Sequence, residues 1–97
     1  MIVNKDILKM KDAHDIAGLD WIMLHGKGLK PTEAAIALVE LDDPTIVNDV
    51  WNYALSDPDH RHGPEFITVL GKSANPMYHE LMVTLLNKAY RNSHKSR

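Results

Sequence analysis

The chain has 97 residues, 44% of them apolar, no cysteine and a formal net charge of −2. This length corresponds to one domain, and the missing cysteine excludes disulfide bonds, thiolate zinc sites and cysteine catalysis. No apolar run approaches the roughly 20 residues of a membrane span, and the first residues lack the apolar stretch of a signal peptide. We therefore expect a cytoplasmic protein that does not contact a membrane, and one whose modest core would gain stability from a partner subunit.

Charge is unevenly distributed along the chain. Residues 88–97 carry four of the eleven Lys and Arg residues and no acidic one, which leaves seven basic and thirteen acidic residues in the rest. An acidic body repels a polyanion, whereas a basic end can contact phosphate. We therefore divide the chain into one helical domain, residues 1–90, and a basic C-terminal tail, residues 91–97.

Helical patterns occupy the first half of the chain. Apolar residues at 3–4 spacing predict a first helix over Lys5–His25, interrupted near Ala17 and Gly18, and Gly26 and Gly28 provide its stop. Pro31 suits the first turn of a helix and predicts a second one over Thr32–Leu41.

Residues 43–64 predict one more helix and a loop. Asp43 followed by Pro44 is a strong start signal, a carboxylate cap and then proline, and predicts a third helix that continues through Ala54. Residues 56–64 contain two prolines and a glycine, so we expect a loop there.

The last third predicts a strand and a final helix. The β-branched and aromatic residues of Glu65–Leu70 predict a short strand or extended arm. A single strand leaves its backbone groups unpaired, so we expect the same arm of a second copy to pair with it. Asn75 and Pro76 then cap and start the last helix. The predicted fold is mainly α, a small domain of four to five helices with one short strand or arm.

One histidine cluster resembles a metal site. His60 and His62 follow Asp57 and Asp59, but structural zinc sites need four ligands in fixed geometry. We favour a polar surface loop over a metal site, and we predict no cofactor. The chain also lacks a glycine-rich phosphate loop and a serine in a nucleophile-like context, so we predict no catalytic residue and no enzyme activity.

Residues 28–35, GLKPTEAA, resemble the turn of a helix-turn-helix motif. The helix after the next break, however, begins at Asp42 and Asp43 and carries Asp49, with no Lys or Arg between Lys30 and Arg61. A recognition helix of this charge would place carboxylates against DNA phosphates, so we predict that this motif does not read DNA.

The start of the last helix is a better candidate for a phosphate contact. Backbone N–H groups and the helix dipole favour an anion at a helix N-terminus. The alternative is ordinary capping of that helix by Asn75. The candidate residues directly precede the helix and are Lys72, Ser73, Ala74 and Asn75.

The order of these segments resembles the FlhD family, the smaller subunits of the bacterial flagellar master transcriptional activator, and the divergent FlhD-like activators of conjugative plasmids and integrative conjugative elements. The resemblance begins near Asp6–Lys9 and is densest over Asp15–Leu55, DIAGLDWIMLHGKGLKPTEAAIALVELDDPTIVNDVWNYAL. It resumes at PEFITVL, Pro64–Leu70, and in the last helix. The missing cysteine, Gly26 and Gly28, and the turn Ser73–Asn75 depart from the flagellar pattern and favour a mobile-element activator.

The resemblance implies an intertwined, mainly helical homodimer. It further implies assembly with a larger, zinc-containing FlhC-like subunit, binding of promoter DNA by the complex, and recruitment of RNA polymerase. It places DNA contact on the turn Lys72, Ser73, Ala74 and Asn75, and contact with the larger partner on the last helix, at His79, Met82 and Val83.

The predicted homodimer buries the apolar faces of the first and third helices. Trp21 and Trp51 stand in apolar helices, where tryptophan is typical of a core or a subunit interface. We therefore predict a subunit of a heteromeric DNA-binding activator; the alternative is a small phage or plasmid protein that binds and inhibits a host protein. The predicted dimer interface comprises Trp21, Ile22, Leu24, Ile46, Val50, Trp51 and Phe66.

Overall fold

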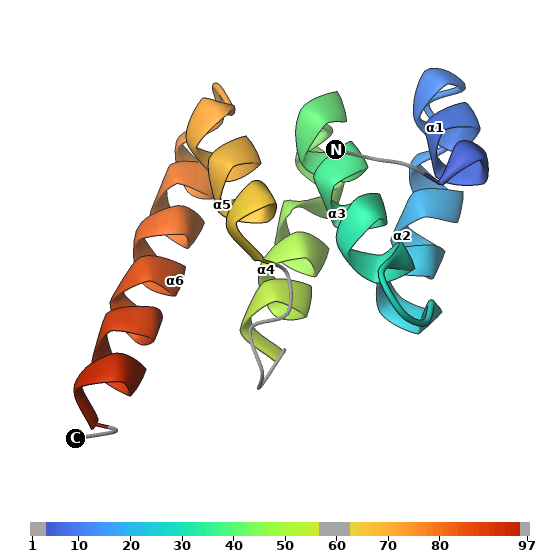
Figure 1. The fold of residues 1–97 in the computed structure, drawn as a ribbon. Helices are drawn as coiled ribbons and strands as arrows, with labels where there is room; N and C mark the ends of the chain where they lie inside the picture. Colours follow the sequence, from blue (N-terminus) through green and yellow to red (C-terminus); the bar gives the residue numbers. More distant parts are fainter. Residues whose placement is uncertain (1–3, 57–62, 96–97) are drawn as a thin grey trace.

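The computed structural model describes residues 4–56 and 63–95, and in this part of the chain the regular structure is helical (Figure 1). The predicted mainly helical class is confirmed, with more helices than expected. In chain order the elements are α1 (Lys5–Asp12), α2 (Ile16–His25), α3 (Lys30–Leu41), the 3-10 turn η1 (Pro44–Ile46), α4 (Val47–Ser56), α5 (Gly63–Lys72) and α6 (Pro76–Lys95).

The predicted first helix is two helices, α1 and α2. Asn4 caps α1, because its Oδ1 accepts the backbone N–H groups of Asp6 and Ile7. The chain breaks at residues 13–15, where His14 adopts a left-handed conformation with φ 53°. We expected the break near Ala17 and Gly18, but it comes before them. The reason is that the Asp15 carboxylate caps α2 by accepting the Gly18 N–H at 3.0 Å.

The turn between α2 and α3 uses both of the predicted glycines. Gly26 is the C-cap of α2, and Gly28 has φ +67°, a conformation that glycine adopts without strain. Helix α3 begins at Lys30, two residues before the predicted start, with Pro31 in its first turn. Its N-cap residue, Leu29, provides no side-chain hydrogen bond to the free N–H groups.

Helix α3 is the centre of the molecule. Seven consecutive residues, 33–39, are buried, so that α3 is covered on all sides rather than on one face. It packs against α1, α2, α4 and α5, and three of its buried residues are alanines, whose small side chains allow helices to approach closely. At its end Asp42 is left-handed, and Asp43 caps the following turn by accepting the Thr45 N–H at 2.8 Å, as predicted.

The predicted strand over Glu65–Leu70 is wrong, because these residues form helix α5. Phe66 and Leu70 are fully buried and are one helical turn apart, whereas Thr68, which a strand would place on their face, is exposed. The Thr68 hydroxyl donates to the Pro64 carbonyl at 3.0 Å, one turn earlier in the helix. Packing of this one face overrides the strand preference of the β-branched residues, and a helix satisfies its own backbone without the expected second copy.

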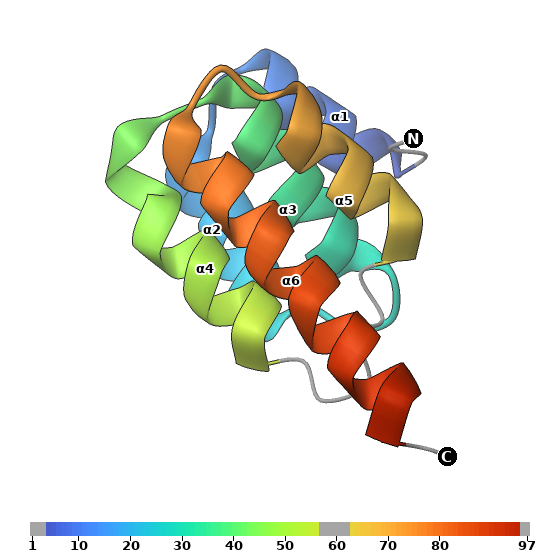
Figure 2. The same cartoon turned by 90° about the vertical axis from the view of Figure 1, so that its left-hand side faces the viewer.

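Helix α6 starts as predicted and is the longest element. Asn75 caps it by accepting the Met77 N–H at 2.9 Å, and it continues to Lys95, so that residues 91–95 of the predicted tail are helical. It packs against α4 and α5 and extends beyond the rest of the bundle (Figure 2).

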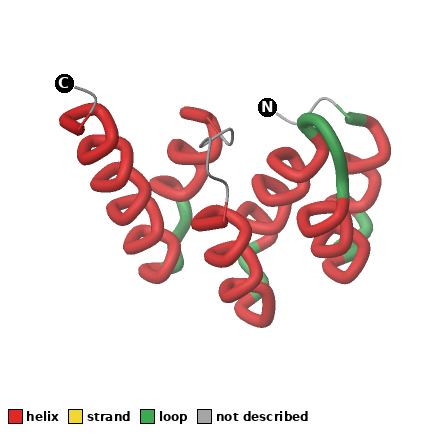
Figure 3. Tube along the Cα trace, turned by 90° about the horizontal axis from the view of Figure 1, so that it is seen from below, coloured by secondary structure: helices red, strands yellow, loops and turns green. Residues whose placement is uncertain are grey.

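The contacts between helices place α3 at the centre of the arrangement. Figure 3 shows the described residues as helices joined by short loops. The pair α1 and α2 packs on one side of it, α5 packs on another, and α6 lies on the outside against α4 and α5. No β-strand occurs in residues 4–56 and 63–95. Within these ranges, no helix is both long enough and apolar enough to cross a membrane. The largest fully buried side chains are Tyr78, Phe66, Ile7, Leu19, Leu38, Leu70 and Leu81.

Candidate functional site

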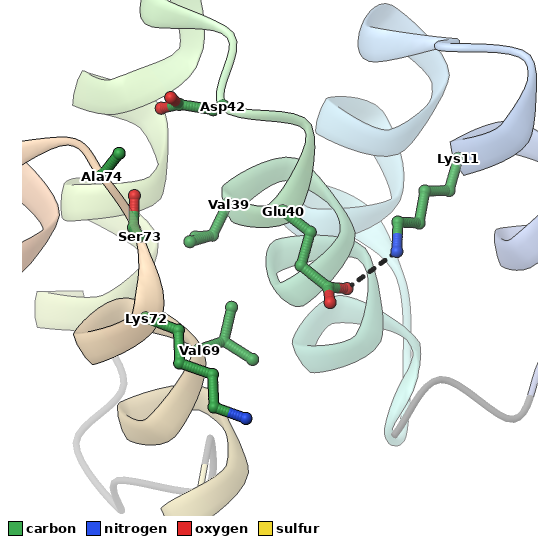
Figure 4. Close-up of a pocket in the computed structure, with 8 residues that line it drawn as sticks. All are labelled: Lys11, Val39, Glu40, Asp42, Val69, Lys72, Ser73 and Ala74. Atoms are coloured by element: carbon green, nitrogen blue, oxygen red, sulfur yellow. Dashed lines mark hydrogen bonds and ion pairs between the residues drawn. The ribbon is translucent and has the colours of Figure 1, made fainter.

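Three of the four predicted DNA-binding residues line a surface hollow of about 500 Å³ between α3 and α5 (Figure 4). Lys72 ends α5, and Ser73 and Ala74 follow it in the turn to α6. The hollow is completed by residues from α1, from α3 and its C-cap, and from α5: Lys11, Val39, Glu40, Asp42 and Val69.

The charges around this hollow do not favour a phosphate. Lys11 is already paired with Glu40 on α3, with 3.1 Å between Nζ and Oε1. Asp42 adds a second carboxylate, and the Lys72 ammonium lies at the other end of the hollow from Asp42 in Figure 4. Two lysines and two carboxylates leave no net positive charge to attract a polyanion. Direct DNA contact by this turn therefore stays a prediction.

The N-terminus of α6 is occupied by its own turn. The Asn75 Oδ1 accepts the Met77 N–H, and the Asn75 carbonyl accepts the Tyr78 N–H at 3.0 Å. The Ser73 Oγ accepts the Asn75 N–H at 3.1 Å, and the Ser73 carbonyl lies 2.6 Å from His79 Nε2. The structure therefore shows capping of α6 by Asn75, which was the alternative to a phosphate site at this turn.

Two of the three predicted partner-binding residues lie on an exposed surface of α6. His79 and Val83 border a hollow of about 390 Å³ beside Trp51 on α4. The Trp51 indole N–H donates to the Met77 carbonyl at 3.2 Å, which holds the ring against α6. Met82 does not belong to this surface, because it is half-buried against the core and approaches Gly71 of α5.

The exposed apolar side chains continue along both helices. Leu55 on α4 is 37% exposed, and Val83 and Leu86 on α6 are 51% and 50% exposed. We refer to Trp51, Leu55, His79, Val83 and Leu86 as the α4–α6 surface. The structure thus joins Trp51, predicted to lie in the homodimer interface, with His79 and Val83, predicted to contact the larger partner.

The predicted dimer interface is only partly on the surface. Ile46, Val50 and Phe66 are buried in the core of the single chain, and their part in a dimer interface stays a prediction. Trp21 and Leu24, in contrast, are 62% and 50% exposed on the outer face of α2. Ile22 is half-buried.

A groove beside Trp21 was missed by the sequence analysis. It has a volume of about 360 Å³ and lies between the start of α1, the end of α2 and the turn to α3. Its signal in the sequence is Trp21 followed by two lysines around the glycine turn. We call it the basic groove; α1 and its cap contribute Asn4, Asp6 and Ile7, α2 contributes Trp21, Ile22 and His25, and the turn and the start of α3 contribute Gly26, Lys27 and Lys30.

A carboxylate pair between α2 and α4 was also missed, because its members are 29 residues apart. The pKa of Asp20 is raised to about 6, first by burial and then by the hydrogen bond and charge repulsion of the neighbouring Asp49, against the attraction of His25. One Asp20 oxygen, Oδ1, is buried with no hydrogen-bond partner among the described residues. The pair can share a proton near neutral pH.

The candidate metal ligands His60 and His62, with Asp57 and Asp59, lie outside the described residues. In the part of the chain that the structure describes, no three His, Asp or Glu side chains are grouped so that they could hold a metal ion.

Comparison with known proteins adds no relative. No protein-family model, curated protein or solved structure matches this chain.

Proposed function

We propose that this chain is an assembly subunit of a DNA-binding transcriptional activator of the FlhD type, one that pairs with a second copy of itself and with a larger, zinc-containing FlhC-like subunit. The observation that carries the proposal is the presence of two separate exposed apolar surfaces. One lies on α2, with Trp21 and Leu24, and the other is the α4–α6 surface. Helices α2 and α6 lie on opposite sides of the molecule (Figure 1).

Two such surfaces suit a subunit with two protein contacts. Clustered large apolar side chains on a small protein mark interaction sites, since their contact with water is unfavourable. Burying one leucine side chain is favourable by about 1.5–3 kcal/mol, and tryptophan is frequent among the residues that dominate interfaces. One surface for a second copy and one for a different partner produce a symmetric array.

The DNA part of the proposal is supported by the resemblance over Asp15–Leu55. The hollow at Lys72 also holds Glu40 and Asp42, which supports a complex in which the partner makes most of the DNA contact. A symmetric complex holds several weak phosphate contacts at fixed spacing and so multiplies their effect. In this proposal RNA polymerase is recruited by the assembled complex at a promoter.

The proposal is tested by a gel-shift series with promoter DNA. The chain is purified alone and after co-expression with the FlhC-like protein, and both samples are titrated against promoter DNA over a range of salt concentrations. We expect the complex to shift the DNA with an affinity that falls as salt rises, and the chain alone to shift it little. Tight, specific binding by the chain alone contradicts the proposal. A stable complex that binds no DNA also contradicts it and favours an inhibitor of a host protein.

A further inference from the structure

The basic groove combines an apolar floor with an exposed aromatic wall. Ile7, at the bottom, is only 1% exposed, whereas Trp21, at the side, is 62% exposed. The Trp21 ring packs against the ring of His25, which also lines the groove, at a centroid distance of 5.1 Å and an interplanar angle of 42°. The groove therefore offers an apolar side chain a place beside a ring that is already positioned.

The rim of the groove is positively charged. Lys27 and Lys30 lie on one side, and the structure gives neither an ion pair with a described residue. Asp6 is the one carboxylate in the lining, against two lysines and His25. Helix α3 begins at Lys30 without a side-chain cap, and the carboxylate in its first turn, Glu33, accepts the Asn4 N–H at 3.1 Å.

This charge disfavours a second copy as the occupant. A two-fold contact places the same surface patch of both copies face to face, and this patch has two lysines against one carboxylate, so two copies would bring an excess of positive charge together. The α4–α6 surface does not have this difficulty, because its hollow carries one carboxylate, Glu80, next to His79. Across a two-fold axis, those two side chains can lie opposite each other.

The surroundings also disfavour nucleic acid. Leu24 and Leu29, 50% and 73% exposed, lie on α2 and on the turn beside the lysines. A protein segment that carries both apolar and acidic side chains would complement the apolar residues and the lysines of the groove at the same time.

We propose that the basic groove binds an acidic segment of the larger partner, which inserts an apolar side chain beside Trp21 and places carboxylates against Lys27 and Lys30. This inference rests on the proposed function for the identity of the partner. It leaves the α4–α6 surface to the second copy, in place of the partner contact that the sequence predicted at His79 and Val83.

The test uses tryptophan fluorescence of this chain alone. Trp21 and Trp51 are its two tryptophans, so a Trp51→Phe variant reports on the groove. It is titrated with a synthetic amphipathic helical peptide that carries a leucine stripe flanked by glutamates, with the same peptide carrying lysines instead, and with a single-stranded thymidine oligonucleotide. We expect the acidic peptide to bind about tenfold or more tightly than either other probe, with a preference that weakens as salt rises.

Two charge variants complete the test in the same background. Lys27→Glu with Lys30→Glu should reverse the preference between the two peptides. The matched control, Lys9→Glu with Lys88→Glu, makes the same change in net charge at lysines outside the groove and should leave the preference intact. Circular dichroism verifies that both variants fold.

Three results overturn the inference: equal binding of the two peptides, tighter binding of the oligonucleotide, or loss of self-association in the Lys27→Glu, Lys30→Glu variant, which would make the groove the homodimer contact. Because the peptide titration needs neither DNA nor the partner, it can fail while the gel shift succeeds, and the reverse. The two proposals are therefore distinguishable.

Discussion

At the scale of single residues, Tyr78 places a hydroxyl group in the core. The side chain is fully buried, and its oxygen has no hydrogen-bond partner among the described residues. Burial, together with the charges of Asp42 and Asp43, raises the pKa of this phenol to about 12, so the group keeps its proton. A buried donor without an acceptor destabilises a fold by about 1–3 kcal/mol.

We therefore expect Tyr78→Phe to stabilise the protein by about 1 kcal/mol or more, since it removes the unsatisfied hydroxyl and keeps the ring. The matched control is Tyr53→Phe, which removes a hydroxyl that lies 2.9 Å from the Thr32 hydroxyl. That variant should lose about 0.5–1.5 kcal/mol. Urea unfolding of both variants measures the difference, and a destabilised Tyr78→Phe would show that the hydroxyl is satisfied in solution.

The pair Asp20 and Asp49 makes stability depend on pH. The pKa of Asp20 is raised from 3.8 to about 6, first by burial and then by Asp49. Between these two values the folded state binds more protons than the unfolded state, so the contribution of Asp20 to stability falls as pH rises through this window and stays low above it.

The variant Asp49→Asn removes the charge repulsion, and we expect it to flatten this part of the pH profile and to stabilise the protein near neutral pH. The readout is the free energy of unfolding of wild type and variant from about pH 4 to about pH 7.5. Asp12→Asn, at an exposed carboxylate on α1, is the control and should leave the shape of the profile unchanged. Superimposable profiles of the two variants would contradict the coupling.

At the scale of elements, the buried side chains of α5 follow the spacing of a helix and not the alternation of a strand. Phe66 and Leu70 are fully buried, and Thr68 between them is exposed. We expect Phe66→Ala to cost about 3–5 kcal/mol and Leu70→Ala about 2–5 kcal/mol. Thr68→Ala should change stability by no more than about 0.5 kcal/mol. Chemical unfolding of the three variants measures these changes. A large loss of stability in Thr68→Ala would contradict the helix and favour the strand that the sequence predicted.

Local signals predicted the helix starts well, because caps act over a few residues. Asp43 and Asn75 cap as expected, and the glycines of the α2–α3 turn end α2. The division of the first helix was misplaced by a few residues, since Asp15 acts as a cap and Gly18 lies inside α2. The strand was predicted from residue type alone, although Phe66 and Leu70 already have helical spacing.

The features that depend on packing between distant segments could not be read from the sequence. Seven consecutive residues of α3 are buried because α3 lies at the centre of four other helices. No local sequence pattern predicts that position. The basic groove joins residues 4–7 to residues 21–30, and the carboxylate pair joins α2 to α4. Trp21 and Trp51 were identified as core or interface residues, but which of them is exposed depends on how the helices are placed.

At the scale of the whole molecule, the two apolar surfaces differ in charge. The α2 side has Lys27 and Lys30 beside its exposed apolar residues, whereas the hollow in the α4–α6 surface carries Glu80 and His79. Like charges at a two-fold contact repel, so the surface with fewer charges is the better one for a second copy. An apolar, weakly charged contact is also the one whose binding free energy falls most when an unpaired carboxylate is buried in it.

We therefore expect Val83→Glu combined with Leu86→Glu to convert the proposed homodimer to a monomer. Both side chains are about half exposed in the single chain, so the substitutions should leave the helix content of the protomer unchanged. In the dimer, however, four carboxylates would enter an apolar contact without partners. The mass in solution, measured by light scattering after size-exclusion chromatography, gives the oligomeric state, and circular dichroism verifies the fold.

Trp21→Glu combined with Leu24→Glu makes the same kind of change on the α2 side and should leave the chain dimeric while it weakens binding of the larger partner. The opposite outcome, a dimer with glutamates at residues 83 and 86 and a monomer with glutamates at residues 21 and 24, would assign self-association to α2 and the α4–α6 surface to the larger partner.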